Sequence, residues 1–226
     1  MTVFSKPVKT AASSGIRAAV LCLMVLGGAF ALPAAPVRAG DGITLLVIGD
    51  SLTAGYGLKR GDGFTDQLQA HLDRVRPGIT VVNGGVSGDT TAGGRARLDW
   101  MLADAPDAVI LELGGNDGLR GLDPTETEAN LDAMLVELAK REIPVLLAGM
   151  QAPPNMGEEY AADFRSVFPR LAGKHGVVFY PFFLEGVAGK LSLNQDDAIH
   201  PNANGVARIV ENILPAVAAL LDRVKS

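Results

Sequence analysis

Five short apolar runs, separated by longer stretches with helical spacing, are the feature that most limits how this chain can fold. The runs cover residues 43–48, 79–82, 108–113, 145–148 and 177–180, and such near-continuous runs are typical of strands buried on both faces of a sheet. Helical spacing covers residues 64–75, 91–102, 125–141 and 158–174, and a last helix is expected to begin at Pro201 and to kink or restart at Pro215. This alternation predicts an α/β fold with a five-stranded parallel sheet covered by helices on both faces.

The polar motifs of the chain follow the ends of the predicted strands. Asp50 and Ser51 follow the first strand, Gly88 lies beyond the second, residues 114–117 follow the third, residues 150–156 follow the fourth, and Asp197 and His200 come after the fifth. Ligands of parallel sheets bind outside the carboxyl ends of the strands. We therefore expect all these positions to lie on one edge of the sheet and to form a single site.

Residues 1–39 have the composition of an export signal. Three basic residues precede an apolar run over residues 18–32, which is shorter than the roughly 20 residues that a membrane span needs. Val37 and Ala39 are small residues at positions −3 and −1 of a cleavage site after Ala39. An uncleaved anchor or a lipoprotein attached through Cys22 are the alternatives, but Cys22 lacks the small residues expected before a lipidated cysteine. We expect an exported, periplasmic or secreted protein with its folded domain over residues 40–226.

The chain without this leader is acidic. Four of the 20 Lys and Arg residues and none of the 25 Asp and Glu residues lie in residues 1–39, so the remainder carries a net charge of −9. That balance argues against nucleic acid as a partner, and against stable membrane association after cleavage. The single cysteine also lies in the leader, so the exported domain forms no disulfide.

Short motifs carry the residue types of a hydrolytic triad. Ser51 lies in Gly-Asp-Ser-Leu, and Asp197 precedes His200 by three residues, so that one turn can orient the histidine as a base toward the serine. Gly88, in Ser-Gly-Asp-Thr, and Asn116, in Gly-Gly-Asn-Asp, can donate hydrogen bonds to an oxyanion. Each motif alone is also ordinary turn or capping chemistry. The serine is not in a Gly-x-Ser-x-Gly elbow, which argues against an α/β-hydrolase.

Together and in this order, the motifs resemble the SGNH (GDSL-type) hydrolases, and specifically their bacterial exported arylesterase, acyl-CoA thioesterase and lysophospholipase branch. The resemblance covers essentially all of residues 40–226 and implies a three-layer α/β/α, flavodoxin-like fold. It implies a serine esterase that acts through an acyl-enzyme on small-molecule esters or thioesters, with no cofactor and no metal. The implied triad is Ser51, Asp197 and His200, and the implied oxyanion donors are the N–H groups of Ser51 and Gly88 and the Asn116 amide. Glycine at position 88 would let the backbone approach the ligand closely.

The loop over residues 150–156 is expected to tune acyl preference, because it lies on the active edge and contains no acid–base group. The residues expected to contact the substrate are Gln151, Pro153, Pro154 and Met156. Outside this loop, helical spacing predicts a core position for Trp100 and solvated positions for Arg95 and Arg97. Asp89 is expected to stabilise the loop that carries Gly88.

Three other functions fit parts of this pattern. A glycan O-acetylesterase of the same fold would present the same carbonyl to the same triad. A metallophosphoesterase would use Asp50, Asn116 and His200 as ligands, but such sites need several histidines, and His71 and His175 fall far from the predicted edge. A non-catalytic acyl- or glycan-binding protein on this scaffold would have no reason to keep the full set of Ser, Gly, Asn, Asp and His.

Overall fold

The computed structural model describes residues 42–225. The predicted leader, residues 1–39, lies outside the described residues.

A parallel five-stranded sheet forms the centre of the domain, in the order β2-β1-β3-β4-β5. The strands are β1 (Ile43–Gly49), β2 (Ile79–Gly85), β3 (Ala108–Glu112), β4 (Val145–Ala148) and β5 (Val178–Tyr180). Every residue of β3 and β4 is buried, as the near-continuous apolar runs predicted. The five predicted strands and their parallel arrangement are confirmed. The largest difference in their bounds is at β2, which continues three residues beyond the predicted end.

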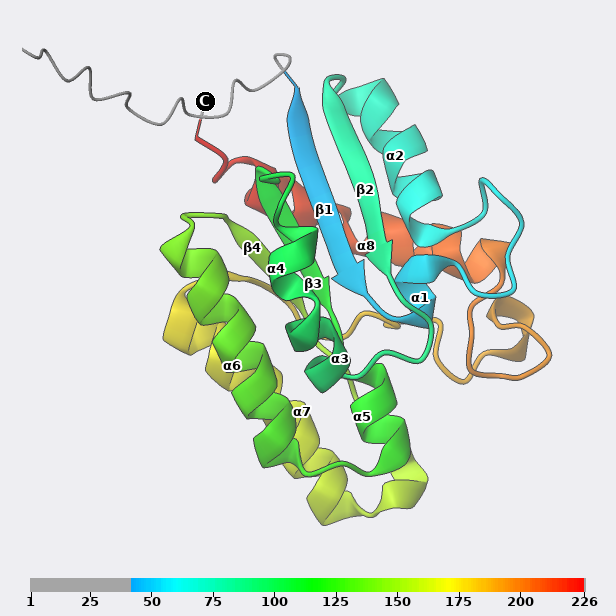
Figure 1. The fold of residues 1–226 in the computed structure, drawn as a ribbon. Helices are drawn as coiled ribbons and strands as arrows, with labels where there is room; N and C mark the ends of the chain where they lie inside the picture. The colour runs from blue at the N-terminus through cyan, green and yellow to red at the C-terminus, as the bar shows by residue number, and fades with distance from the viewer. Residues whose placement is uncertain (1–41, 226) are drawn as a thin grey trace, which may run out of the picture. The chain divides into compact units, whose positions relative to one another are not determined.

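Helices cover both faces of the sheet (Figure 1). Helices α2 (Phe64–Val75) and α8 (Ala203–Leu221) pack together on one face, and α6 (Pro124–Lys140) and α7 (Glu158–His175) pack together on the other. Short helices α1 (Ser51–Ala54) and α5 (Gly115–Arg120) directly follow β1 and β3. The predicted three-layer α/β/α arrangement is confirmed.

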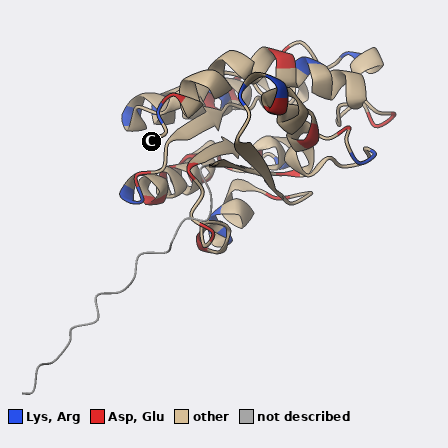
Figure 2. Cartoon of the chain, turned by 90° about the horizontal axis from the view of Figure 1, so that it is seen from above, with Lys and Arg blue, Asp and Glu red and all other residues tan. Residues whose placement is uncertain are grey.

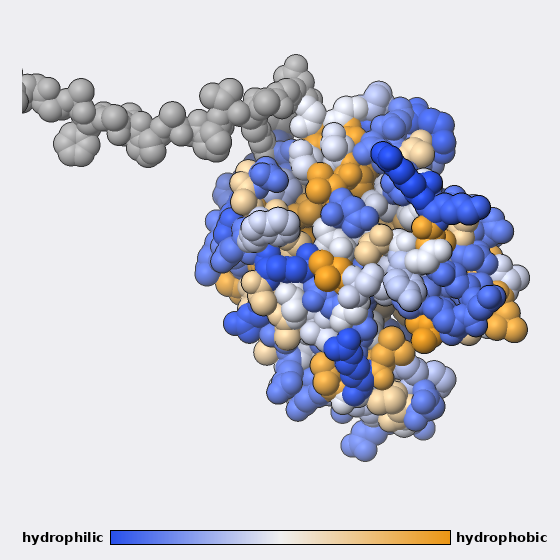
Figure 3. All heavy atoms as spheres, turned by 45° about the vertical axis from the view of Figure 1, so that its right-hand side comes forward, coloured by the Kyte–Doolittle hydropathy of each residue, from blue (hydrophilic) through white to orange (hydrophobic). Residues whose placement is uncertain are grey.

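The predicted helix over residues 91–102 is wrong in one respect, because it is broken at Arg97. The observed helices are α3 (Thr91–Ala96) and α4 (Leu98–Met101). Helix α4 buries Leu98 and Met101, so Trp100 falls on the opposite side and its exposed fraction is 80%. The predicted core position of Trp100 is therefore also wrong. On the face drawn in Figure 3, hydrophobic residues lie singly or in small groups among hydrophilic ones.

A last helix follows Pro201, as predicted, but Pro201 is not its first residue and the helix does not restart at Pro215. Pro201 pairs with Asn194 in an isolated bridge, and α8 instead begins after Asn202, whose side chain accepts hydrogen bonds from two backbone N–H groups of the first turn. Pro215 lies inside α8 without ending it. Ile213 and Val217 on either side of this proline are fully buried. Packing of this buried stripe therefore outweighs the hydrogen bond that proline removes.

Candidate active site

Ser51, His200 and Asp197 form a continuous hydrogen-bonded chain. His200 Nε2 lies 2.9 Å from Ser51 Oγ, and His200 Nδ1 lies 2.6 Å from Asp197 Oδ2. Hydrogen bonds from the backbone and ring of His200, and from the backbone of Ile199, lower the pKa of Asp197 to about 2. Asp197 is thus a carboxylate at neutral pH, which favours the proton on Nδ1 and leaves Nε2 as the hydrogen-bond acceptor that faces the serine.

The turn that carries His200 is held by hydrogen bonds from its backbone to the side chain of Asp197. Asp197 Oδ1 accepts the N–H groups of Ile199 and His200, both at 2.9 Å, and Ala198 has a left-handed φ of 57°. The ring of Tyr56 lies against the imidazole of His200, with 4.6 Å between the ring centroids. The sequence reasoning missed Tyr56, because only the folded chain brings residue 56 to this turn.

The position of Ser51 is set by the junction of β1 and α1. Asp50 caps α1, with its Oδ1 accepting the N–H of Leu52 at 2.9 Å. Deeper in the protein, the Glu112 side chain at the end of β3 accepts a hydrogen bond from Thr53 Oγ1 at 2.6 Å, and its Oε1 has no partner among the described residues. Burial, followed by the charge of Asp50, raises the pKa of Glu112 well above its usual range.

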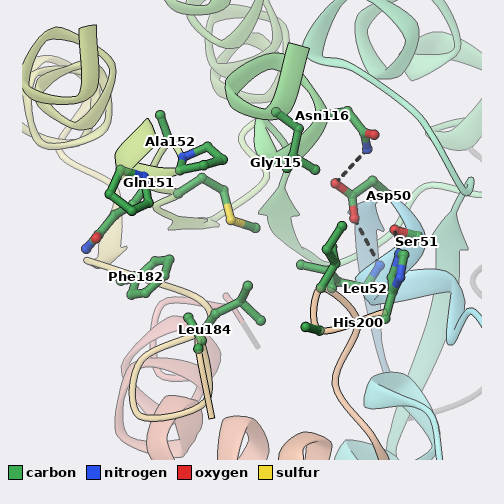
Figure 4. Close-up of a pocket in the computed structure, with 18 residues that line it drawn as sticks. Asp50, Ser51, Leu52, Gly115, Asn116, Gln151, Ala152, Phe182, Leu184 and His200 are labelled. Carbon is green, nitrogen blue, oxygen red and sulfur yellow. Dashed lines mark hydrogen bonds between the residues drawn. The ribbon is translucent and has the colours of Figure 1, made fainter. Parts of the chain in front are cut away.

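Asn116 is held by the same aspartate. Its Nδ2 donates to Asp50 Oδ2 at 3.1 Å (Figure 4), which occupies one of the two amide hydrogens and fixes the plane of the group. Burial raises the pKa of Asp50 to about 6, although the hydrogen bonds from Leu52 and Asn116 and the charge of His200 lower it. The sequence placed Asp50 on the active edge and gave it a role only as a ligand of the alternative metallophosphoesterase, and its hydrogen bond with Asn116 could not be read from the sequence.

Gly88 lies in a tight turn between β2 and α3. The N–H of Asp89 bonds to the carbonyl of Val86 at 3.0 Å, and Gly88 has a φ of 83°. A Cβ at position 88 would meet nothing nearer than a side-chain nitrogen of Arg120 at 3.8 Å, so the turn conformation, rather than lack of space, accounts for glycine here. Arg120 donates to the carbonyl of Gly88 at 2.9 Å, and Arg97 pairs with Asp89 at 2.6 Å.

Helix α5 ties the Gly88 turn to Asn116, because Arg120 and Asn116 lie on the same helix. The expectation that Asp89 stabilises this turn is confirmed by its ion pair, and the expectation that Arg97 is solvated is wrong. Its side chain has an exposed fraction of only 19%.

A cavity of about 480 Å³ lies next to Ser51 and His200. Ser51, Asn116 and His200 lie at one end (Figure 4), whereas the remainder is mostly apolar. The other lining residues come from five segments and are Asp50, Leu52, Gly115, Leu119, Met150, Gln151, Ala152, Pro153, Pro154, Phe182, Leu184, Ala188, Gly189, Ala198 and Ile199. Among the predicted loop residues, Gln151, Pro153 and Pro154 thus line the cavity. Met156 lies outside this lining, with its methyl group against Gly121.

Gly88 and Asp197 are also outside the cavity lining. Phe182 and Leu184 were missed by the sequence reasoning. Their signal was an apolar Phe-Phe-Leu run that begins two residues after the last residue of the fifth strand, on the expected edge of the sheet.

Among the described residues, no three His, Cys, Asp or Glu side chains gather as they would around a metal ion. Of the two other histidines, His71 lies on α2, and His175 lies at the end of α7, where it contacts Asp132. In Figure 2 basic and acidic residues are interspersed along the helices rather than gathered by sign.

Comparison with known proteins gives consistent matches. Residues 47–208 match the GDSL-like Lipase/Acylhydrolase family. Esterase TesA of Pseudomonas aeruginosa is 43% identical over 179 residues, which are 79% of this chain and 89% of that protein. An arylesterase of Vibrio mimicus is 39% identical over 74% of this chain and 84% of its own. The thioesterase 1/protease 1/lysophospholipase L1 of Escherichia coli is 40% identical over 73% of this chain and 78% of its own.

Solved structures agree with these relatives. A crystal structure of TesA superposes with a TM-score of 0.75 at 43% identity and covers 78% of this chain and 99% of its own. A crystal structure of esterase EstA from Pseudoalteromonas sp., inhibited by monoethylphosphonate, has a TM-score of 0.75 at 33% identity and covers 79% of this chain and 98% of its own. With its fold, the family match and these relatives in agreement, the chain belongs to the GDSL-like lipase/acylhydrolase family, and it is a serine esterase of the SGNH type.

Proposed function

We propose that the protein hydrolyses acyl esters and thioesters through an acyl-enzyme on Ser51, with His200 as base and Asp197 as its orienting carboxylate. The single observation that carries this proposal is the hydrogen-bonded chain from Ser51 Oγ to Asp197 Oδ2, placed at the end of an apolar cavity. A bare serine hydroxyl is a weak nucleophile at neutral pH, and this chain supplies the base that activates it.

The reaction proceeds in two steps. As Ser51 Oγ attacks the acyl carbonyl carbon, His200 Nε2 takes the hydroxyl proton, and Asp197 stabilises the resulting imidazolium. The tetrahedral intermediate collapses, and the leaving alcohol or thiol takes that proton from His200. Water then attacks the acyl-enzyme with the same base, which releases the carboxylic acid and restores the serine.

The negative oxygen of the tetrahedral intermediate requires donors that are already in place. We assign this role to the N–H groups of Ser51 and Gly88 and to the second amide hydrogen of Asn116. The bond from Asn116 to Asp50 supports the assignment, since it fixes the amide before substrate arrives.

The cavity favours a hydrocarbon acyl group over a sugar. Beyond the polar end, its walls are formed by side chains such as Leu119, Phe182 and Leu184, which stabilise apolar groups by excluding water. The names of the relatives, which include esterase, arylesterase and thioesterase 1/lysophospholipase L1, point to the same substrate classes.

Covalent labelling tests the nucleophile. A fluorophosphonate should label the wild type and not Ser51→Ala, and Ser51→Ala should lose ester hydrolysis with an unchanged melting temperature. Equal labelling of both proteins would place the nucleophile elsewhere. A panel of aryl esters and thioesters with graded chain lengths then ranks the substrates.

We further propose that the protein is exported to the periplasm and that the leader is removed after Ala39. The basic and apolar segments of residues 1–39 support this proposal. Intact-mass measurement of the protein recovered from the periplasm should give a chain that begins at Gly40. A full-length chain in the membrane fraction would instead show anchoring.

A further inference from the structure

Arg97 lies at the break between α3 and α4, and its side chain turns inward beneath the active edge of the sheet. Besides a contact with Met101 Sδ at 2.6 Å, its guanidinium donates to oxygen atoms from three segments: the carbonyl of Gly49 at 3.0 Å, the carbonyl of Gly84 at 2.7 Å and the carboxylate of Asp89 at 2.6 Å. Both partners of the ion pair are partly buried, with side-chain exposed fractions of 19% and 14%.

These three contacts connect the two ends of the proposed oxyanion hole. Gly49 ends β1, two residues before Ser51, and Asp89 directly follows Gly88. The carbonyl of Gly49 also accepts the N–H of Val86, at the start of the Gly88 turn, at 3.1 Å. One side chain therefore spans the gap between the nucleophile strand and the turn that carries the second donor.

The surrounding backbone leaves room for this ion pair. A Cβ on Gly93 would collide with the carboxylate of Asp89, so α3 can approach the Gly88 turn only with glycine at that position. The planar guanidinium presents five N–H donors in a fixed geometry, whereas a lysine ammonium is a single flexible point charge. Lysine would keep the charge near Asp89 without holding both glycine carbonyls.

We infer that Arg97 is a positioning residue of the oxyanion hole, which sets the separation between the N–H of Ser51 and the N–H of Gly88. This inference rests on the proposed function, since it assigns no role to Arg97 unless those two groups stabilise the oxyanion. Arg97 acts from outside the cavity, through Gly49 on one side and Asp89 on the other. It is expected to affect the transition state, in which the oxyanion exists, and not substrate binding.

The test compares Arg97→Lys with Arg95→Lys. Arg95 lies on α3 two residues before Arg97, is exposed and donates to Asn130 Oδ1 at 3.2 Å, so its replacement is the matched control. Fluorophosphonate titration counts the reactive serines in each preparation, and kcat is expressed per reactive serine. Arg97→Lys should lower this kcat about 10- to 100-fold, the order expected for a small misplacement of a catalytic group, while KM stays within about twofold. Arg95→Lys should match the wild type.

Two further variants make the outcome decisive. Asp89→Asn removes the charge that anchors Arg97 and should reproduce the selective loss of kcat, which also covers the case of a poorly folded Arg97 variant. A lower melting temperature with wild-type kcat per reactive serine, in both Arg97→Lys and Asp89→Asn, would make Arg97 purely structural and overturn the inference. Asn116→Ala tests the oxyanion hole independently of Arg97: wild-type kcat in that variant would refute the oxyanion hole itself.

Discussion

At the scale of single residues, Asn116 makes the sharpest distinction between a catalytic site and an ordinary turn. We expect Asn116→Ala to lower kcat roughly 10²–10³-fold, a cost of about 3–4 kcal/mol for one lost oxyanion donor. KM should change little, because the donor meets a charge that exists only in the transition state. Steady-state kinetics and thermal melts on the same preparation measure both effects. An unstable variant with normal turnover per folded molecule would show that Asn116 only shapes the turn.

Asp197 contacts both the backbone of its own turn and the His200 ring, and one substitution separates these two contacts. In Asp197→Asn, the remaining side-chain oxygen can still accept the N–H groups of Ile199 and His200, so the turn should persist. The new amide would face His200 Nδ1 as a donor and favour the wrong tautomer. We expect kcat to fall on the order of 10⁴-fold. Asp196→Asn removes the same charge one residue away and is the control. A loss below about tenfold would reduce Asp197 to a supporting role.

The sequence predicted the residues that lie in motifs after the strands. It did not predict the residues whose contacts depend on how loops and helices pack. Ser51, Asp197 and His200 follow strand ends, and the expected meeting of parallel strands at one edge brings them within hydrogen-bonding distance. Tyr56 and Arg97 carry no such signal, because their contacts depend on the exact packing of a loop and a broken helix. Arginine on a helix is usually solvated. Here the guanidinium of Arg97 is held inside by the carbonyls of Gly49 and Gly84, near the ends of β1 and β2, and by Asp89.

At the scale of elements, hydrophobic periodicity predicted every strand and the four long helices but misjudged the ends and breaks of helices. The spacing over residues 91–102 is helical throughout, yet the chain turns at Arg97, whose contacts with Gly49, Gly84 and Asp89 compete with continued helix. At Pro215, the opposite occurs: tertiary packing preserves a helix that local propensity would end. The helix break at Arg97 and the continuous helix at Pro215 both depend on tertiary contacts, which hydrophobic periodicity cannot predict.

The loop over residues 150–156 is the element expected to set acyl preference. Pro153 and Pro154 line the cavity, and Pro154 begins a single 3₁₀ turn, η1 (Pro154–Met156). Replacing both prolines with glycine should loosen this wall, since it restores backbone freedom. We expect a changed preference among long acyl chains, with short-ester turnover preserved. Met156→Ala, outside the lining, is the control. Loss of short-ester activity in a well-folded double variant would contradict the assignment.

At the scale of the whole molecule, two buried carboxyl groups beneath the nucleophile couple global stability to pH. The pKa of Asp50 is raised to about 6 by burial, against about 3.9 in an unfolded chain. Between these values the folded protein binds more protons than the unfolded one, so its free energy of unfolding falls as pH rises through this window. The raised pKa of Glu112 acts in the same direction.

We therefore expect Asp50→Asn to remove part of this dependence. The melting temperature of the variant minus that of the wild type should increase from about pH 4 to about pH 7, because only the wild type must bury a carboxylate at the higher pH. The variant also relieves the charge that raises the pKa of Glu112, which strengthens the same trend. Asp104→Asn, at an exposed position, should give a difference that is flat with pH. A difference for Asp50→Asn that is equally flat would mean that Asp50 titrates at its ordinary pKa, and a difference that decreases with pH would mean that its ionised form stabilises the fold.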